Sequence, residues 1–258
     1  MYHYLRQHPD VFMSPVKEPQ YYWSEGWADY PESVQTAAAY ERLFAGVTTE
    51  RAIGEASVRM LHSPTAVERV FRDLPGVRLV ASLRNPAHRA YSHHLHRMRV
   101  GEERRGAEEA LVPGSPAFET SFYAEALQRW LGRFPRERLH VILYEDFAAE
   151  PRRTMRDLFA FLDVDPSFAI DTSTVHNPAA APRSQLLTAA VWKLIRAVRR
   201  ILPAPLRDRG FGARLARLTW RRADPMPPAL RRRLLDAYRD DIAATGRLLG
   251  RDLSFWFV

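Results

Sequence analysis

The stretch VRLVASLRNPAHRAYSHHLHRM, residues 77–98, decides the fold that this chain is expected to adopt. It opens with an apolar, β-branched run that is typical of a buried strand, and the run ends at Arg84. Asn85 and Pro86 follow, and these residue types are preferred at the N-cap and the first position of a helix. We therefore predict a strand over 77–83 that passes directly into a helix.

The predicted strand-to-helix junction is a place where an anion can bind. The first backbone N–H groups of a helix have no partner within it, and the guanidinium of Arg84 comes just before them in the chain. Ser92 follows eight residues after Arg84 and is close enough to join the same site. The alternative is an ordinary junction in which Arg84 makes a structural salt bridge.

Composition limits the class of protein. The chain has 258 residues, enough for one α/β domain, and it has no cysteine, which excludes disulfides and thiolate metal sites. Its net charge of +8 comes almost entirely from arginine, a bias that also arises from GC-rich coding sequence. Because no nucleic-acid reader motif accompanies the charge, we expect no nucleic-acid partner. Neither a transmembrane run nor a signal peptide is recognisable, and we expect a cytoplasmic protein.

Strand and helix patterns alternate along the chain, which predicts a mostly parallel sheet flanked by helices. We expect one domain over 1–258, with 184–258 as its helical C-terminal part. The segment 184–202 is an amphipathic pattern whose basic side we interpret as a solvated helix face. Further helices are predicted at 1–8, 32–45, 64–71, 117–133, 151–162 and 228–249, and further strands at 11–13, 54–61 and 139–144.

The chain resembles the sulfotransferases that use 3′-phosphoadenosine 5′-phosphosulfate (PAPS), and in particular the branch of the heparan sulfate sulfotransferases and their bacterial relatives. LRNPAHRAYS is similar to the family's 3′-phosphate-binding segment, so the resemblance places that phosphate on Arg84 and Ser92. It also implies a P-loop-like α/β fold. Four more segments are similar, in family order: YLRQHPDVFMSPVKEP, GEASVRML, VILYEDFAAEPRRTMRDLFAFLDV and GRLLGRDLSFW.

The catalytic expectation depends on KEPQYYW, which begins at Lys17. By resemblance, Glu18 matches the family's catalytic base, and Lys17 is expected to pair with sulfonate or phosphate oxygens. Tyr21, Tyr22 and Trp23 next to it would partly desolvate the carboxylate, which favours a base. The alternative is a surface Lys–Glu pair in a loop.

A second segment, GEASVRML, resembles the family stretch that helps to hold the cofactor. On that resemblance Ser57 and Arg59 are candidate cofactor-binding residues, and Arg59 replaces the charge of a lysine that relatives have in place of Ala56. The alternative is a loop that is stabilised because Glu55 pairs with a neighbour.

Two other segments contain residue types that bind ligands in proteins. His176, Asn177 and Arg183 lie where relatives have a basic loop over the adenosine bisphosphate, and Arg183 is the candidate that would contact it. The HHxH sequence that begins at residue 93 does not place three imidazoles on one helix face, so we expect no metal site.

One family feature is missing from the matching segments. The family's 5′-phosphosulfate loop, of the form GxPKxGT[TS], and the strand before it have no counterpart, since the similarity begins at Met1. We therefore expect an N-terminally truncated domain whose 258 residues transfer sulfate inefficiently. The leading hypothesis is sulfuryl transfer from PAPS to a hydroxyl or amine of a carbohydrate. The alternative is a non-catalytic relative that binds anionic glycan or nucleotide.

Overall fold

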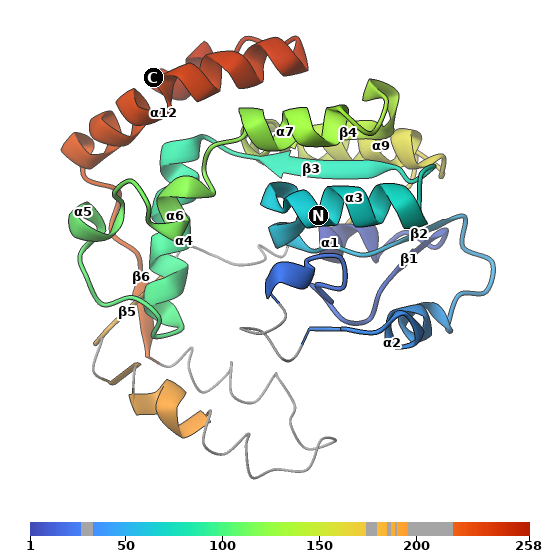
Figure 1. The fold of residues 1–258 in the computed structure, drawn as a ribbon, viewed down its shortest axis with the longest axis horizontal. Coiled ribbons are helices and arrows are strands. Elements are labelled where there is room, and N and C mark those ends of the chain that lie inside the picture. The colour runs from blue at the N-terminus through green and yellow to red at the C-terminus, as the bar shows by residue number, and fades with distance from the viewer. Residues whose placement is uncertain (27–32, 174–179, 185–186, 189, 196–218) are drawn as a thin grey trace.

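Strand β3 (Leu79–Leu83) passes into helix α4 (Pro86–Arg99) in the computed structural model, as Figure 1 shows. Asn85 is the N-cap of α4, because its side chain accepts a hydrogen bond of 3.2 Å from the backbone N–H of His88. This confirms the predicted junction. The strand is less buried than predicted, since Val80 is 39% exposed and Leu83 alone in β3 is buried.

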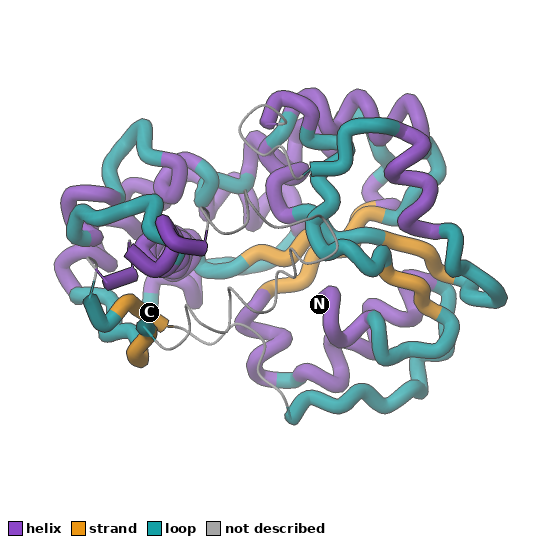
Figure 2. The backbone as a smooth tube through the Cα atoms, turned by 90° about the horizontal axis from the view of Figure 1, so that it is seen from below, coloured by secondary structure: helices purple, strands orange, loops and turns teal. Residues whose placement is uncertain are grey.

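The strands form three two-stranded ladders. Strands β1 (Val11–Met13) and β2 (Ala52–Gly54) pair in parallel, as do β3 and β4 (Leu139–Leu143). Strands β5 (Ala180–Pro182) and β6 (Trp220–Arg222) pair antiparallel. Figure 2 shows helices on either side of the parallel ladders, so the class is α/β with parallel sheets between helices, as predicted. The structure describes residues 1–26, 33–173, 180–184, 187–188, 190–195 and 219–258.

Helices surround the parallel ladders. Two of them, α9 and α12, have the bounds that the sequence pattern predicts. The described α-helices besides α4 are α1 (Tyr2–Leu5), α2 (Ala37–Glu41), α3 (Pro64–Asp73), α5 (Ala107–Ala110), α6 (Pro116–Glu119), α7 (Ala124–Leu131), α8 (Tyr144–Ala149), α9 (Pro151–Leu162) and α12 (Pro228–Leu249). The described 3₁₀ helices are η1 (Ser24–Gly26), η2 (Arg42–Phe44), η3 (Val58–His62), η4 (Arg136–Arg138) and η6 (Ser254–Phe257).

The single helix predicted over 117–133 is wrong, because two helices occupy the segment. The hydroxyl of Ser121 donates to the carbonyl oxygen of Ala117 at 2.9 Å, at the end of α6. Asp241 of α12 then accepts the backbone N–H groups of Tyr123 and Ala124 at 2.8 and 2.9 Å. This cap comes from the other end of the chain, so the local pattern does not contain it.

The strand predicted over 54–61 is also misplaced. Strand β2 ends at Gly54, because its partner β1 ends at Met13 in the paired register, and 58–62 is a 3₁₀ helix. In the segment 184–202, the predicted apolar stripe is only partly covered. Leu187 and Leu194 are 51% and 58% exposed, whereas Ile195 is buried.

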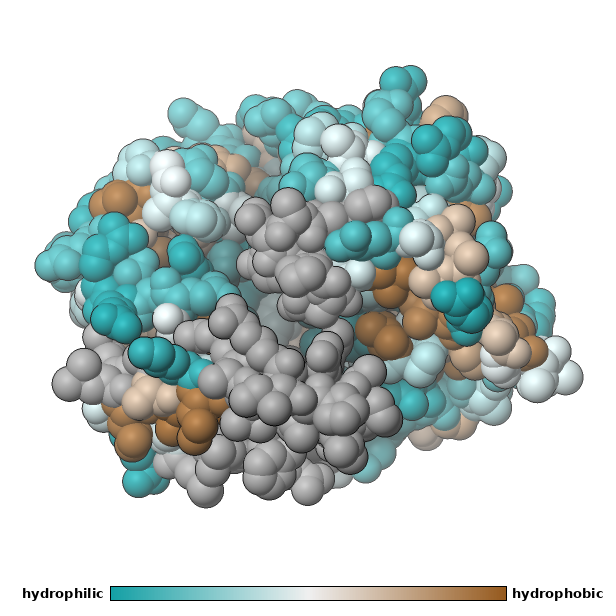
Figure 3. Space-filling model, turned by 60° about the horizontal axis from the view of Figure 1, so that its bottom comes forward, coloured by the Kyte–Doolittle hydropathy of each residue, from teal (hydrophilic) through white to brown (hydrophobic). Residues whose placement is uncertain are grey.

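The largest core cluster lies where α12 packs on α4 and α7. It joins residues from both ends of the chain, for example Leu83 of β3, Leu127 of α7 and Tyr238 of α12. A second cluster joins β1 and β4 to α9, and a third surrounds Tyr21 and Tyr22. On the face drawn in Figure 3, most of the described surface is hydrophilic.

Candidate active site

The guanidinium of Arg84 lies at the end of β3, over the ring of Tyr144, with its Cζ 4.5 Å from the ring centroid. Its Nε is buried and has no hydrogen-bond partner among the described residues, and no carboxylate there forms an ion pair with it. The alternative of a structural salt bridge is therefore not what the described part of the chain shows. Arg84 carries a half-buried positive charge that no carboxylate of the described residues neutralises.

The backbone around Arg84 is held in place by long-range hydrogen bonds. The hydroxyl of the buried Tyr123 donates to the carbonyl oxygen of Arg84 at 2.9 Å. The same hydroxyl oxygen accepts the backbone N–H of Arg84 at 3.4 Å. The backbone N–H of Asn85 donates to Oε1 of Glu145 at 2.9 Å. The side-chain Nδ2 of Asn85 donates to the carbonyl oxygen of Trp256 at 2.6 Å. These contacts fix the position of Arg84 at the start of α4.

Ser92 belongs to the same strand–helix unit. It is exposed and lies two turns along α4, about 10 Å from Asn85 along the helix axis at the usual rise per residue. Arg84 comes just before α4 and Ser92 lies near its middle, so the same strand–helix unit carries both residues.

The loop that carries Lys17 and Glu18 has an unusual backbone. Glu18 and Gln20 have φ angles of 57° and 61°, in the left-handed region that residues other than glycine rarely adopt. Nζ of Lys17 lies 3.8 Å from Oε1 of Glu18, with 40% and 32% of the two side chains exposed. Glu18 is thus a carboxylate that the fold partly covers and that lies next to an ammonium.

Hydrogen bonds to the segment after β2 hold this backbone. The N–H of Glu18 donates to the carbonyl oxygen of Ala56 at 3.0 Å. The N–H of Gln20 donates to Oγ of Ser57 at 3.1 Å, and that hydroxyl donates to Oε2 of Glu55 at 2.8 Å. Glu55 therefore pairs with a neighbour, as the alternative for GEASVRML predicts. The hydroxyl of Ser57 acts both as donor, to Glu55, and as acceptor, from Gln20, within the protein.

Glu55 is the titratable group that the sequence did not single out as functional. Burial raises its pKa to about 7, the Ser57 hydrogen bond opposes this shift, and the negative charge of Glu18 adds to it. Its second oxygen, Oε1, is buried without a hydrogen-bond partner among the described residues. Burial and nearby charges, including Glu55, also raise the pKa values of Tyr22 and Tyr40. Glu55 therefore lies close enough to Tyr22 and Tyr40 for its charge to act on both.

The remaining predicted residues lie on other elements. Arg59 lies over the ring of Trp23, with its Cζ 4.7 Å from the centroid. Arg183 follows β5, and its Nε donates to the carbonyl oxygen of Trp220 at 2.9 Å. His176 and Asn177 lie outside the described residues.

No group of three or more His, Asp or Glu side chains among the described residues is placed to hold a metal ion. No helix in the described part of the chain is both long and apolar enough to cross a membrane.

The fold and the junction define an α/β protein with a candidate anion site where a parallel strand enters a helix. The family model described as "Sulfotransferase family" matches residues 3–168. The chain belongs to this family.

Two known proteins illustrate the similarity. The solved structure of a sulfotransferase from Alicyclobacillus acidocaldarius superposes with a TM-score of 0.73, at 29% identity, over 99% of this chain and 92% of that chain. The membrane-associated sulfotransferase kil1 of Dictyostelium discoideum is 40% identical over 55 residues, which are 20% of this chain and 12% of that protein. The family and the fold therefore support sulfuryl transfer.

Proposed function

We propose that this protein transfers a sulfuryl group from PAPS to a hydroxyl or amine of an acceptor, with a carbohydrate as the acceptor class. Family membership supports the reaction class, and the identity of the donor and the acceptor is the proposed part. The observation that carries the donor assignment is the guanidinium of Arg84, which is half-buried and has an Nε without a partner among the described residues.

The residues around Arg84 fit a phosphate group. In the first turn of α4, Pro86 has no N–H group, and the N–H groups of His88 and Arg89 both donate to Asn85, which leaves the N–H of Ala87. The main anion-binding group at this junction is therefore the guanidinium of Arg84, a group that binds phosphate in many proteins. We assign Arg84 and Ser92 to the 3′-phosphate of the donor, and Arg59 and Arg183 to its other charged groups.

Glu18 is the proposed general base. A hydroxyl or amine acceptor must lose a proton as its oxygen or nitrogen bonds to sulfur, and the Glu18 carboxylate receives that proton. PAPS supplies the sulfuryl group, and the bond between sulfur and the bridging phosphate oxygen breaks as adenosine 3′,5′-bisphosphate leaves. Lys17, 3.8 Å from Glu18, provides positive charge for the sulfonate oxygens.

Ser57 has a different role in this proposal from the direct cofactor contact that the sequence suggests. Its hydroxyl donates to Glu55 and accepts from Gln20, so a contact with PAPS would cost one of these bonds. We assign Ser57 to the positioning of the loop that carries Glu18. A single domain over residues 1–258 is supported by the cluster that joins Leu83 of β3 to Tyr238 of α12.

The test compares two nucleotides that differ by one phosphate. Calorimetric titration of the 258-residue chain with adenosine 3′,5′-bisphosphate and with AMP measures the contribution of the 3′-phosphate directly. We expect Arg84→Ala to weaken binding of the bisphosphate by roughly tenfold or more, because a charge-assisted contact is lost. Binding of AMP should change far less.

Arg152→Ala is the matched control, since Arg152 is an exposed arginine on α9. It should bind both nucleotides as the unchanged chain does. The assignment fails if neither Arg84→Ala nor Ser92→Ala weakens binding of the bisphosphate. Glu18→Gln tests the base separately, because it should abolish transfer from PAPS while binding of the bisphosphate is retained.

A further inference from the structure

The carboxylate of Glu55, directly after strand β2, is connected to the proposed base by hydrogen bonds. Its Oε2 accepts the hydroxyl of Ser57 at 2.8 Å, and its Oε1 is buried without a hydrogen-bond partner among the described residues. A buried oxygen without a donor is unfavourable for the fold. The proposed transfer reaction assigns this carboxylate no role, and its contacts indicate one.

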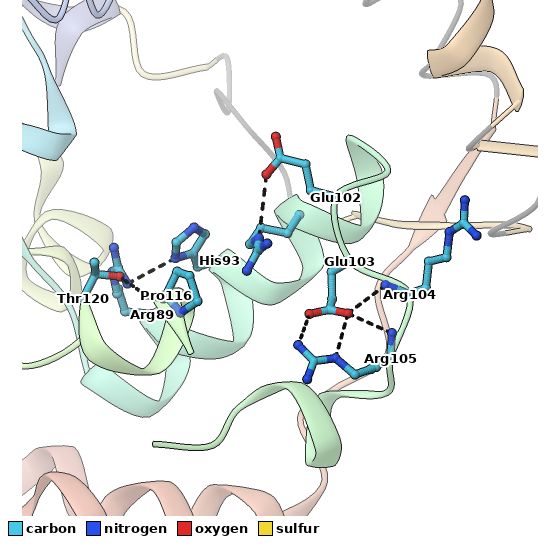
Figure 4. A network of polar contacts seen from close by, with 9 residues as sticks. Arg89, His93, Glu102, Glu103, Arg104, Arg105, Pro116 and Thr120 are labelled. Carbon is cyan, nitrogen blue, oxygen red and sulfur yellow. Dashed lines mark hydrogen bonds and ion pairs between the residues drawn. The ribbon is translucent and has the colours of Figure 1, made fainter. Parts of the chain in front are cut away.

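Arg89 of α4 is a partly buried charged residue of a different kind. The described contacts of its guanidinium are with Ala117, Thr120 and Ser121 and with His93 on α4 itself. Figure 4 shows the contacts with Thr120 and His93. They hold α4 against α6 and the residues that follow it. None of these contacts reaches the loop of the proposed base, whereas those of Glu55 do.

The segment after β2 binds the backbone of that loop at its two left-handed residues. The carbonyl oxygen of Ala56 accepts the N–H of Glu18 at 3.0 Å, and Oγ of Ser57 accepts the N–H of Gln20 at 3.1 Å. The φ angles of Glu18 and Gln20 are 57° and 61°, a conformation that persists only where the surrounding structure holds it. The contacts of Ala56 and Ser57 therefore determine the shape of the loop.

The side chain of Gln20 completes the connection from Glu55 to the base. Gln20 is 8% exposed, and its Nε2 donates a long hydrogen bond of 3.5 Å to Oε2 of Glu18. Oε1 of Glu18 has a different neighbour, since it lies 3.8 Å from Nζ of Lys17. The amide donor and the ammonium thus distinguish the two oxygens of the carboxylate.

The contact between Ser57 and Glu55 does not require a negative charge on Glu55. Burial raises the pKa of Glu55 to about 7, so the protonated and ionised forms are both present near neutral pH. The oxygen of Ser57 accepts from Gln20, which leaves its hydroxyl hydrogen for Oε2 of Glu55. An acid that carries its proton on Oε1 still accepts at Oε2, so both forms keep the connection.

We propose that Glu55 is a positioning residue for the base Glu18. It acts through Ser57, which fixes the backbone of Gln20. The amide of Gln20 then holds Oε2 of Glu18, so that Oε1 takes the proton of the acceptor.

The proposal rests on the proposed function, since it takes Glu18 as the base. Lys17, which the proposed function assigns to the sulfonate oxygens, lies next to the same Oε1. A carboxylate held in one orientation favours proton transfer, because the base must be within hydrogen-bond reach of the proton that it removes.

The first measurement needs no catalysis. Nitrogen-15 NMR follows the side-chain amide of Gln20, which is assigned as the signal that Gln20→Met lacks. Glu18→Gln removes the charged acceptor and should shift this resonance. In Glu55→Leu, where the Ser57 hydroxyl has lost its acceptor, the same replacement should no longer shift it. In Glu55→Gln the shift should return, because the glutamine oxygen accepts that hydroxyl.

Glu41→Leu is the matched control, since Glu41 is an exposed glutamate on α2. There Glu18→Gln should shift the amide of Gln20 as in the unchanged chain. A full shift in Glu55→Leu, or none in the unchanged chain, overturns the proposal. Ser57→Ala breaks the same connection and decides the question if Glu55→Leu does not fold.

The second measurement is transfer from PAPS to glucosamine, a probe that presents both hydroxyls and an amine on a sugar. Glu55→Leu should lower kcat by roughly tenfold or more and leave KM for PAPS unchanged, because the base is misplaced while the nucleotide contacts remain. Glu55→Gln should keep most of the rate. Equal losses in the two variants would contradict a role that depends on the Ser57 contact.

The outcomes separate this proposal from the proposed function. If Glu18→Gln abolishes transfer but Glu55→Leu keeps its full kcat, the role of Glu55 is wrong while the base assignment stands. If Glu18→Gln transfers as the unchanged chain does, or if no variant transfers at all, the assigned reaction is wrong. The NMR comparison then still decides whether Glu55 holds the Glu18 carboxylate in place.

Discussion

The hydroxyl of Ser57 donates a hydrogen bond of 2.8 Å to the carboxylate of Glu55 and so connects a buried acid to the loop of the proposed base. Its oxygen also accepts the N–H of Gln20, whose φ of 61° is left-handed. The contact therefore stabilises a backbone conformation that is otherwise unfavourable by about 1–3 kcal/mol. Glu18, two residues earlier, shares that conformation.

Glu55→Gln should change how stability depends on pH. Burial raises the pKa of Glu55 to about 7, above its value of 4.5 in an unfolded chain, so the folded state binds this proton more tightly. The resulting stabilisation is complete below pH 4.5 and is lost as the pH rises through 7. The free energy of unfolding in urea should therefore fall by on the order of 2 kcal/mol between these values from this group alone.

The glutamine variant should lose that part of the slope, because an amide does not titrate. Glu50→Gln is the matched control, since Glu50 is an exposed glutamate near β2 whose pKa is lowered by hydrogen bonds from Thr48. The same slope in the Glu55→Gln variant as in the unchanged chain would show that Glu55 is not the responsible group.

Ser57→Ala should destabilise the fold by about 1–3 kcal/mol, because it leaves the N–H of Gln20 and the carboxylate of Glu55 without this partner. The loss should be larger at pH 8 than at pH 5, where Glu55 is mostly protonated. Urea unfolding at the two pH values measures the difference. Ser57→Thr keeps the hydroxyl and should recover most of the stability, which a purely steric role of residue 57 does not predict.

The elements that the sequence predicts well are those whose signals are local. The N-cap Asn85 and the periodic apolar residues of α9 and α12 lie within the element they define, and these helices have the predicted bounds. The break between α6 and α7 is different. It depends on Asp241, which accepts the N–H of Tyr123 from a position 118 residues further along the chain.

The candidate site shows the same division. Arg84 and Ser92 are found from one continuous motif, and the structure keeps them on one strand–helix unit. The burial of the Glu55 carboxylate is not visible in the sequence, because it depends on packing. Its Oε1 is buried without a hydrogen-bond partner among the described residues, and its partner Ser57 accepts the N–H of Gln20, 37 residues earlier in the chain.

Tyr123→Phe tests whether the position of Arg84 matters for nucleotide binding. Removal of the hydroxyl leaves the carbonyl oxygen of Arg84 without its 2.9 Å donor, which should cost about 1–2 kcal/mol of unfolding free energy. If this bond holds Arg84 in place for the 3′-phosphate, affinity for adenosine 3′,5′-bisphosphate should also fall, by roughly three- to tenfold. Affinity for AMP should hardly change.

Tyr238→Phe separates that effect from a general loss of stability. Tyr238 is also a buried tyrosine, and its hydroxyl donates to the carbonyl oxygen of Phe118 at 3.0 Å, away from Arg84. Its loss should reduce stability by a similar amount and leave affinity for the bisphosphate unchanged. Equal affinities in the two variants, measured by calorimetry under conditions in which both are folded, would mean that the Tyr123 hydroxyl supports the fold alone. A selective loss in Tyr123→Phe would instead make the buried hydroxyl part of the site, since it acts on Arg84 through the backbone.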